Sequence, residues 1–119
     1  MINILFADDG SYANIGEELC GIPNFNLVSA KDSKNVLETL KNKRPEIILM
    51  GNFLDGMDRH TLTRILKNDS DTASITILFI EISLVESELM KNASGTHPIK
   101  TPVDIIVVKE ALLNAAKEK

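Results

Sequence analysis

The fold is indicated most clearly by two segments: Ile2-Asn3-Ile4-Leu5-Phe6-Ala7-Asp8-Asp9 and Glu46-Ile47-Ile48-Leu49-Met50-Gly51. Each is a short, mostly apolar run that stops abruptly, the first at a pair of aspartates and the second at a glycine. Short apolar runs of this kind are typical of strands that are buried on both faces, as in parallel sheets covered by helices. The sequence therefore predicts strands over residues 2–7 and 46–50 of an α/β protein.

The rest of the chain alternates between strand and helix patterns. Further strands are expected at 26–30, 75–82 and around 98–100, and helices at 11–20, 33–43, 58–68, 84–93 and 104–117. Ser11 and Ser33 are placed to cap two of the helices, and Pro45 stops the second. Five strands and five helices in 119 residues predict a single domain over 1–119 with a flavodoxin-like (βα)5 fold. This is a three-layer sandwich whose parallel sheet has the strand order 2-1-3-4-5.

The charge and composition of the chain indicate which classes of partner and which compartment to expect. The chain has a formal net charge of −4 and a pI near 5.1, which argues against coating nucleic acid or an anionic membrane. Its basic cluster, Lys41-Asn42-Lys43-Arg44, is expected to stabilise the end of a helix and not to bind phosphate. The single cysteine, Cys20, rules out an internal disulfide and is expected to be a buried core thiol. With no apolar run long enough to span a membrane, a cytoplasmic domain is expected.

Two motifs carry a resemblance to a known family. Asp8-Asp9 follows the first strand, and Leu54-Asp55-Gly56-Met57-Asp58 follows the third. Both resemble the response-regulator receiver family, with chemotaxis receivers as the pattern. In that family the third strand ends in an aspartate that accepts a phosphoryl group, and the position falls on Gly51 here. A glycine has no nucleophile to offer phosphorus, so the resemblance implies a degenerate pseudo-receiver.

The other positions of the family site also depart from its pattern. Glu81 stands where the resemblance expects a small hydroxyl residue, and Thr101 stands where it expects a lysine. Lys100 lies one residue earlier, which on a strand directs a side chain to the opposite face. In the family, the pair matching Asp8 and Asp9 holds Mg²⁺ together with the missing carboxylate. We expect no cofactor here beyond weak residual Mg²⁺ binding, and favour these aspartates as acceptors of backbone N–H bonds.

The resemblance implies a role in bacterial two-component or phosphorelay signalling. The expected function is that of a non-enzymatic interaction module that contacts a signalling protein or a second receiver copy. The family's interaction face corresponds to the fourth helix, fifth strand and fifth helix, and here includes Glu86, Lys91, Ile106, Val107 and Glu110. Two alternatives stay open: phosphorylation of another carboxylate, namely Asp8, Asp9 or Asp55, and a small-ligand pocket in the room left beside Gly51.

Overall fold

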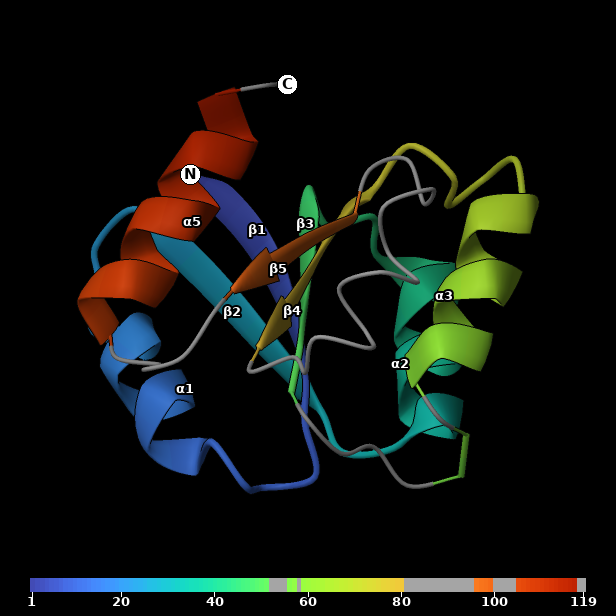
Figure 1. The fold of residues 1–119 in the computed structure, drawn as a ribbon, viewed down its shortest axis with the longest axis horizontal. Helices are drawn as coiled ribbons and strands as arrows, with labels where there is room; N and C mark the ends of the chain where they lie inside the picture. Colours follow the sequence, from blue (N-terminus) through green and yellow to red (C-terminus); the bar gives the residue numbers. More distant parts are fainter. Residues whose placement is uncertain (52–55, 58, 81–95, 100–104, 118–119) are drawn as a thin grey trace.

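The computed structural model describes residues 1–51, 56–57, 59–80, 96–99 and 105–117 (Figure 1). Along the chain the elements are β1 (Ile2–Ala7), α1 (Ala13–Cys20), β2 (Phe25–Ala30), α2 (Ser33–Asn42), β3 (Ile47–Met50), α3 (Arg59–Asn68), β4 (Thr76–Ile80), β5 (Thr96–Ile99) and α5 (Ile105–Lys117). The helix expected at 84–93 lies outside the described residues. No helix in the described ranges is both long and apolar enough to cross a membrane.

The five strands form one parallel sheet in the order β2-β1-β3-β4-β5. β1 lies between β2 and β3, with Ile4 opposite Leu27 on one side and Ile47 on the other. The register continues outward from Ile47 to Thr76, and from Ile77 to Thr96. The predicted flavodoxin-like strand order is confirmed, and all strands end at the same edge, the lower one in Figure 1.

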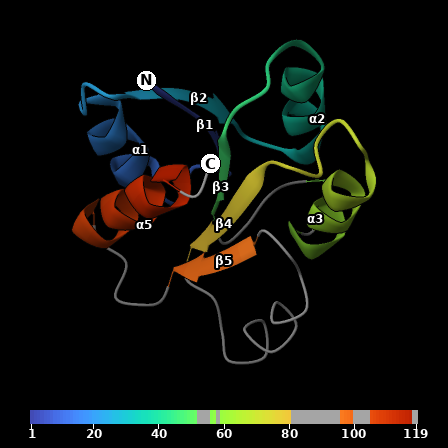
Figure 2. The same ribbon diagram turned by 90° about the horizontal axis from the view of Figure 1, so that it is seen from above.

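Alternation along the strands divides the core into two apolar layers. Residues such as Ile4 and Phe6 of β1 pack toward α1 and α5, whereas Leu5 and Ala7 pack toward α2 and α3. Figure 2 shows the two helix pairs on opposite faces of the sheet. Each fully buried aliphatic side chain contributes roughly 1.5–3 kcal/mol, so these two layers supply most of the driving force for folding.

The predicted helix caps are each wrong by one residue, because the N-cap residues are Tyr12 for α1 and Asp32 for α2. α2 is capped by Asp32, whose Oδ1 accepts the N–H of Asn35 at 2.8 Å, while Ser33 is buried as the first helical residue. α1 begins only at Ala13, and Ser11 donates its hydroxyl to Asp9 Oδ1 at 2.6 Å. In both places an aspartate one or two residues earlier is the stronger acceptor for a nearby N–H or O–H.

The expectation of a buried thiol is also wrong. Cys20 is exposed at the last position of α1, directly after the fully buried Leu19. Successive residues of an α-helix are turned by about 100° around its axis, so burial of Leu19 points its neighbour away from the core.

Candidate functional site

The predicted site lies at the carboxyl edge of the two central strands. Asp8 directly follows β1 and Gly51 directly follows β3. Backbone hydrogen bonds continue past the strand ends here: Gly51 N–H donates to Ala7 at 2.8 Å, and Asp8 N–H donates to Ala30 at 3.0 Å. The structure therefore brings Asp8 and Gly51 side by side.

The Asp8 carboxylate is held by the turn that enters α1. Its Oδ2 accepts the backbone N–H groups of Gly10 and Tyr12, each at 2.9 Å, and the residue is only 6% exposed. Gly10 has a φ of +113°, a conformation that suits glycine. The interpretation of Asp8 as an acceptor of backbone N–H bonds is confirmed.

The other oxygen of this carboxylate lies against Gly51. A Cβ built on Gly51 would overlap Asp8 Oδ1 and would lie 2.8 Å from Asp8 Cγ, closer than real Cβ atoms approach. Asp8 Oδ1 is buried, and it has no hydrogen-bond partner within the part of the chain that the structure describes. The place of the absent side chain at position 51 is therefore taken by the Asp8 carboxyl.

The two adjacent aspartates differ in their readiness to ionise. Burial raises the pKa of the Asp8 carboxyl; the N–H bond from Gly10 opposes this shift, and the neighbouring charge of Asp9 adds to it. Asp9 is exposed, and hydrogen bonds from the hydroxyl and the N–H of Ser11 lower its pKa. The negative charge of the pair is therefore most stable on Asp9, at the surface.

The described residues do not by themselves assemble a site for Mg²⁺. This ion requires near-octahedral oxygen coordination, usually with carboxylates that are free to face it. Asp8 Oδ2 is occupied by two N–H groups, and Asp9 Oδ1 is occupied by Ser11. Across the described ranges, no three His, Cys, Asp or Glu side chains come together as a metal site.

The remaining predicted site residues divide into two groups. Those of α5 are exposed as expected: Ile106 is 66% exposed, Val107 is 37% exposed, and Glu110 is also at the surface. The others lie outside the described residues: Asp55, Glu81, Glu86, Lys91, Lys100 and Thr101.

Sequence reasoning missed a polar pair at the opposite edge of the sheet. Asn3 of β1 and Asn26 of β2 are register partners, and Asn26 Nδ2 donates to Asn3 Oδ1 at 2.8 Å. The available signal was an asparagine at an early position in each of two strand segments, where this residue type is uncommon.

Comparison with known proteins reveals similarity in structure alone. No protein-family profile and no curated protein matches the chain in sequence. The chemotaxis response regulator CheY4 of Vibrio cholerae superposes with a TM-score of 0.82 at 16% identity, covering 97% of this chain and 98% of that one. The signal receiver domain of a histidine kinase from Syntrophus aciditrophicus gives 0.84 at 17% identity, covering 99% and 92%.

A third solved structure is the receiver domain of sensor histidine kinase PA1611 from Pseudomonas aeruginosa, which has a magnesium ion coordinated in its active-site cleft. It superposes with a TM-score of 0.79 at 13% identity, covering 98% of each chain. At identities this low the likeness establishes architecture and no more. The chain has the flavodoxin-like fold found in the receiver domains of two-component signalling proteins.

Proposed function

We propose that this chain is an atypical receiver-like domain that works in two-component-type signalling by protein–protein contact, without phosphorylation at position 51. The fold supports the signalling class, and the motifs at Asp8-Asp9 and residues 54–58 agree with it. The observation that carries the proposal is the Asp8 carboxyl lying in the space of a side chain at Gly51. A phosphoryl group would need that same space.

The other carboxylates near this edge are poor substitutes for the missing nucleophile. Asp8 is buried, is held by two N–H groups, and has a raised pKa. Asp9 is exposed, but its Oδ1 is engaged by Ser11. A phosphoryl acceptor of this type also depends on a cation to neutralise charge, and the described residues do not assemble a site for one.

Contact with a partner is proposed to use the exposed side of α5. Ile106 and Val107 are large apolar side chains at the surface of this helix, while Val108 between the exposed residues is fully buried. A shallow hollow of about 420 Å³ lies beside Ile106 and is bordered by Ile22 of the α1–β2 turn, with Glu18 and Lys109 at its rim. Apolar side chains framed by charges of both signs suit a modest contact with a signalling protein or a second copy.

Phosphorylation can be tested directly by intact-mass spectrometry. The purified chain is incubated with acetyl phosphate and Mg²⁺, beside a conventional receiver domain as a positive control. We expect no phosphorylated species from this chain. A stoichiometric phosphoryl adduct would contradict the proposal, and tandem mass spectrometry would then locate it among Asp8, Asp9 and Asp55.

The proposed contact face needs a separate test. Sedimentation velocity over a range of concentrations, on the wild type and on Ile106→Glu, distinguishes self-association from contact with another protein. Concentration-dependent association that Ile106→Glu abolishes would identify a second copy as the partner. Association that Ile106→Glu leaves unchanged would exclude this face.

A further inference from the structure

We propose that a pocket at the amino edge of the sheet binds a small organic oxyanion. The pocket has a volume of about 250 Å³ and lies between the first residues of β1 and β2 and the end of α2. It is at the opposite end of the strands from Asp8 and Gly51, so the proposal does not depend on the function of that site. The pocket has an apolar floor, a polar wall and a cationic rim.

The floor is apolar because α2 ends before it covers the sheet completely. Leu5 and Val28 lie on the sheet face that packs toward α2 and α3, and both line the pocket. At Lys43 the backbone leaves the helix and becomes extended, with φ −135° and ψ 142°, while its N–H still bonds the Thr39 carbonyl at 2.9 Å. Pro45 then fixes the turn toward β3, which leaves the floor open beside the helix end.

The wall carries groups that bind polar ligands. Asn3 and Asn26 face each other across β1 and β2 and are joined by a hydrogen bond of 2.8 Å between their side chains. Each amide has two donors and an acceptor oxygen, so this one bond leaves capacity for a ligand while it fixes the orientation of both groups. Thr39 of α2 also lines the pocket, with a hydroxyl that can donate or accept.

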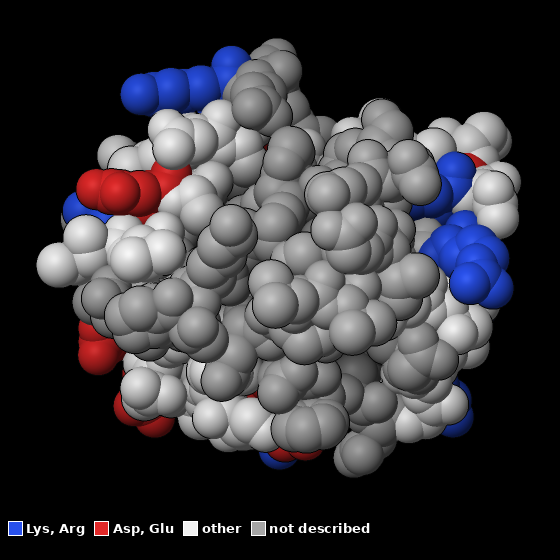
Figure 3. Space-filling view, viewed as in Figure 1, with Lys and Arg blue, Asp and Glu red and all other residues white. Residues whose placement is uncertain are grey.

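The charges at the rim of the pocket determine whether it favours an anion or a cation. Lys43 and Arg44 line the pocket, and none of its described lining residues is acidic, although the whole chain has a net charge of −4. The Glu46 carboxylate lies beside the wall, where its Oε1 accepts the Asn3 N–H at 3.5 Å. In Figure 3, which is viewed from the side of β5, basic atoms lie at the right-hand edge on the side of α3, and most acidic atoms in view lie at the left. An oxyanion would therefore meet two cations at the mouth of this pocket.

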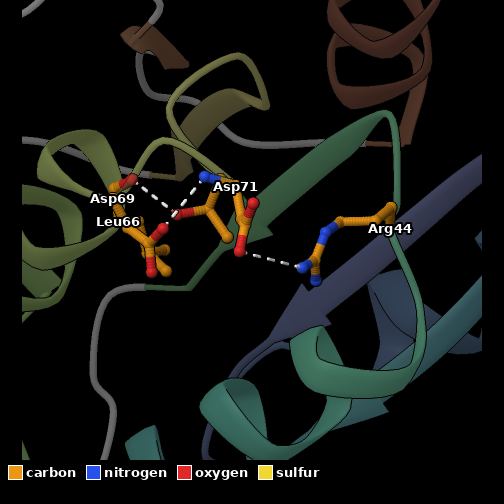
Figure 4. Close-up of polar contacts among 5 residues, drawn as sticks. Arg44, Leu66, Asp69 and Asp71 are labelled. Atoms are coloured by element: carbon orange, nitrogen blue, oxygen red, sulfur yellow. Dashed lines mark hydrogen bonds and ion pairs between the residues drawn. The ribbon is translucent and has the colours of Figure 1, made fainter.

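Arg44 is held loosely enough to reorient toward a ligand. Its Nη2 lies 3.8 Å from Asp71 Oδ2, and the two side chains are 49% and 73% exposed (Figure 4). An exposed pair at this distance is weak. A guanidinium group can donate two parallel hydrogen bonds to the paired oxygens of a carboxylate or phosphate. The single long contact with Asp71 does not use this capacity.

Size and lining together define the ligand class. The volume of about 250 Å³ is just below the range of about 300–1,000 Å³ that is usual for small-molecule pockets, so a ligand of metabolite size suits it. The fitting molecule is a carboxylate or phosphate monoester on a short apolar body. Its head group meets Lys43 and Arg44, its body lies on Leu5 and Val28, and its polar substituents reach the asparagine pair.

The test is a titration of the full chain followed by amide NMR, using hexanoate, glycerol phosphate and inorganic phosphate as separate probes. We expect saturable shifts of the Asn3 and Asn26 side-chain amides and of the backbone amides at Thr39, Lys43 and Arg44. The double variant Lys43→Ala/Arg44→Ala should weaken binding at least about tenfold, since each lost charge-assisted contact is worth about a factor of ten. Both residues are exposed, so the variant should keep the wild-type amide spectrum elsewhere.

Two matched variants sharpen the result. Lys41→Ala removes an exposed cation of the same helix that does not line the pocket, and should leave affinity unchanged. Asp71→Asn frees Arg44 and should maintain or tighten binding. Preference for hexanoate or for glycerol phosphate would identify the head group. Absence of saturation with all three probes, equal loss in Lys41→Ala, or shifts confined to Asp8 and Gly51 would overturn the proposal.

Discussion

The two edges of this one sheet are built in opposite ways. At the carboxyl edge, Asp8 is 6% exposed and its Oδ1 is packed against Gly51. At the amino edge, Asn3 and Asn26 are exposed beside an open pocket with a cationic rim. Open α/β sheets usually bind ligands at the carboxyl edge, yet in this chain that edge is filled at its centre. Sharing a fold with receiver domains therefore does not tell where this protein binds its ligands.

The largest effect on stability should come from adding one methyl group at the carboxyl edge of the sheet. Gly51→Ala is expected to lower the free energy of unfolding by about 1–3 kcal/mol, because the new Cβ overlaps the Asp8 carboxyl. That carboxyl cannot turn aside without leaving the N–H groups of Gly10 and Tyr12. Urea denaturation measures the change. Gly21→Ala is the control, because its Cβ would meet Glu18 O at an ordinary 3.4 Å. An equal loss of stability in both variants would contradict the close packing of Asp8 against Gly51.

A double-mutant cycle should then assign the clash to one residue. Asp8→Ala alone should cost about 0.5–2 kcal/mol, because two N–H groups lose their acceptor. In the Gly51→Ala background the same change should cost less, or should stabilise, because it also removes the overlap. We expect a coupling of about 1 kcal/mol between the two positions. Strictly additive losses would mean that Asp8 does not occupy the place of a side chain at position 51.

The pH dependence should separate the two aspartates. The folded state raises the pKa of Asp8 above its ordinary value of 3.8, so folding favours its protonated form. Stability due to Asp8 is therefore greatest below pH 3.8 and falls as pH rises through the raised pKa. Relative to Asp8→Asn, the wild type should lose stability as pH rises from below 3.8 through the raised pKa of Asp8. Asp9 has a lowered pKa, so relative to Asp9→Asn the wild type should gain stability as pH rises, and equal slopes would contradict this contrast.

The smallest effect on stability should be found at the amino edge of the sheet. Arg44→Ala is expected to change the free energy of unfolding by no more than about 0.5 kcal/mol, because its pair with Asp71 is exposed and long. Thermal unfolding measures this change, with Asp71→Ala as the reciprocal control. A loss comparable to that of Gly51→Ala would show that the amino edge is also a structural element, and would weaken the case for a ligand pocket there.

Much of the fold could be predicted from sequence because of how the central strands are buried. A strand such as residues 47–50, covered on both faces, accepts only apolar side chains, so its position is visible in the sequence. Helix starts were less predictable, because Asp32 takes the capping role expected of Ser33, and Ser11 bonds Asp9 while α1 has no side-chain cap. The prediction that Cys20 is buried fails because the buried face of the helix includes Ile15 and Leu19 but not the residue that follows Leu19.

The site was predictable only in part. The sequence indicated that Asp8 accepts backbone N–H bonds, and it indicated that Gly51 lacks a nucleophile. It did not indicate that the Asp8 carboxyl fills the place of the missing side chain, since that depends on packing between two strands distant in sequence. The position of Lys43 and Arg44 at the end of a helix predicts that they stabilise that helix end. It does not indicate that an open pocket lies beside them, between the helix and the strands.

The contact between Asp8 and Gly51 also constrains the order in which mutations can accumulate. An aspartate restored at position 51 would meet the carboxyl of Asp8 and would reduce stability before it could supply any chemistry. A change at position 8, or a rearrangement of the turn through Gly10 and Tyr12, has to come first. A carboxylate at position 51 is therefore accessible only through a second change, so the order of the two substitutions matters.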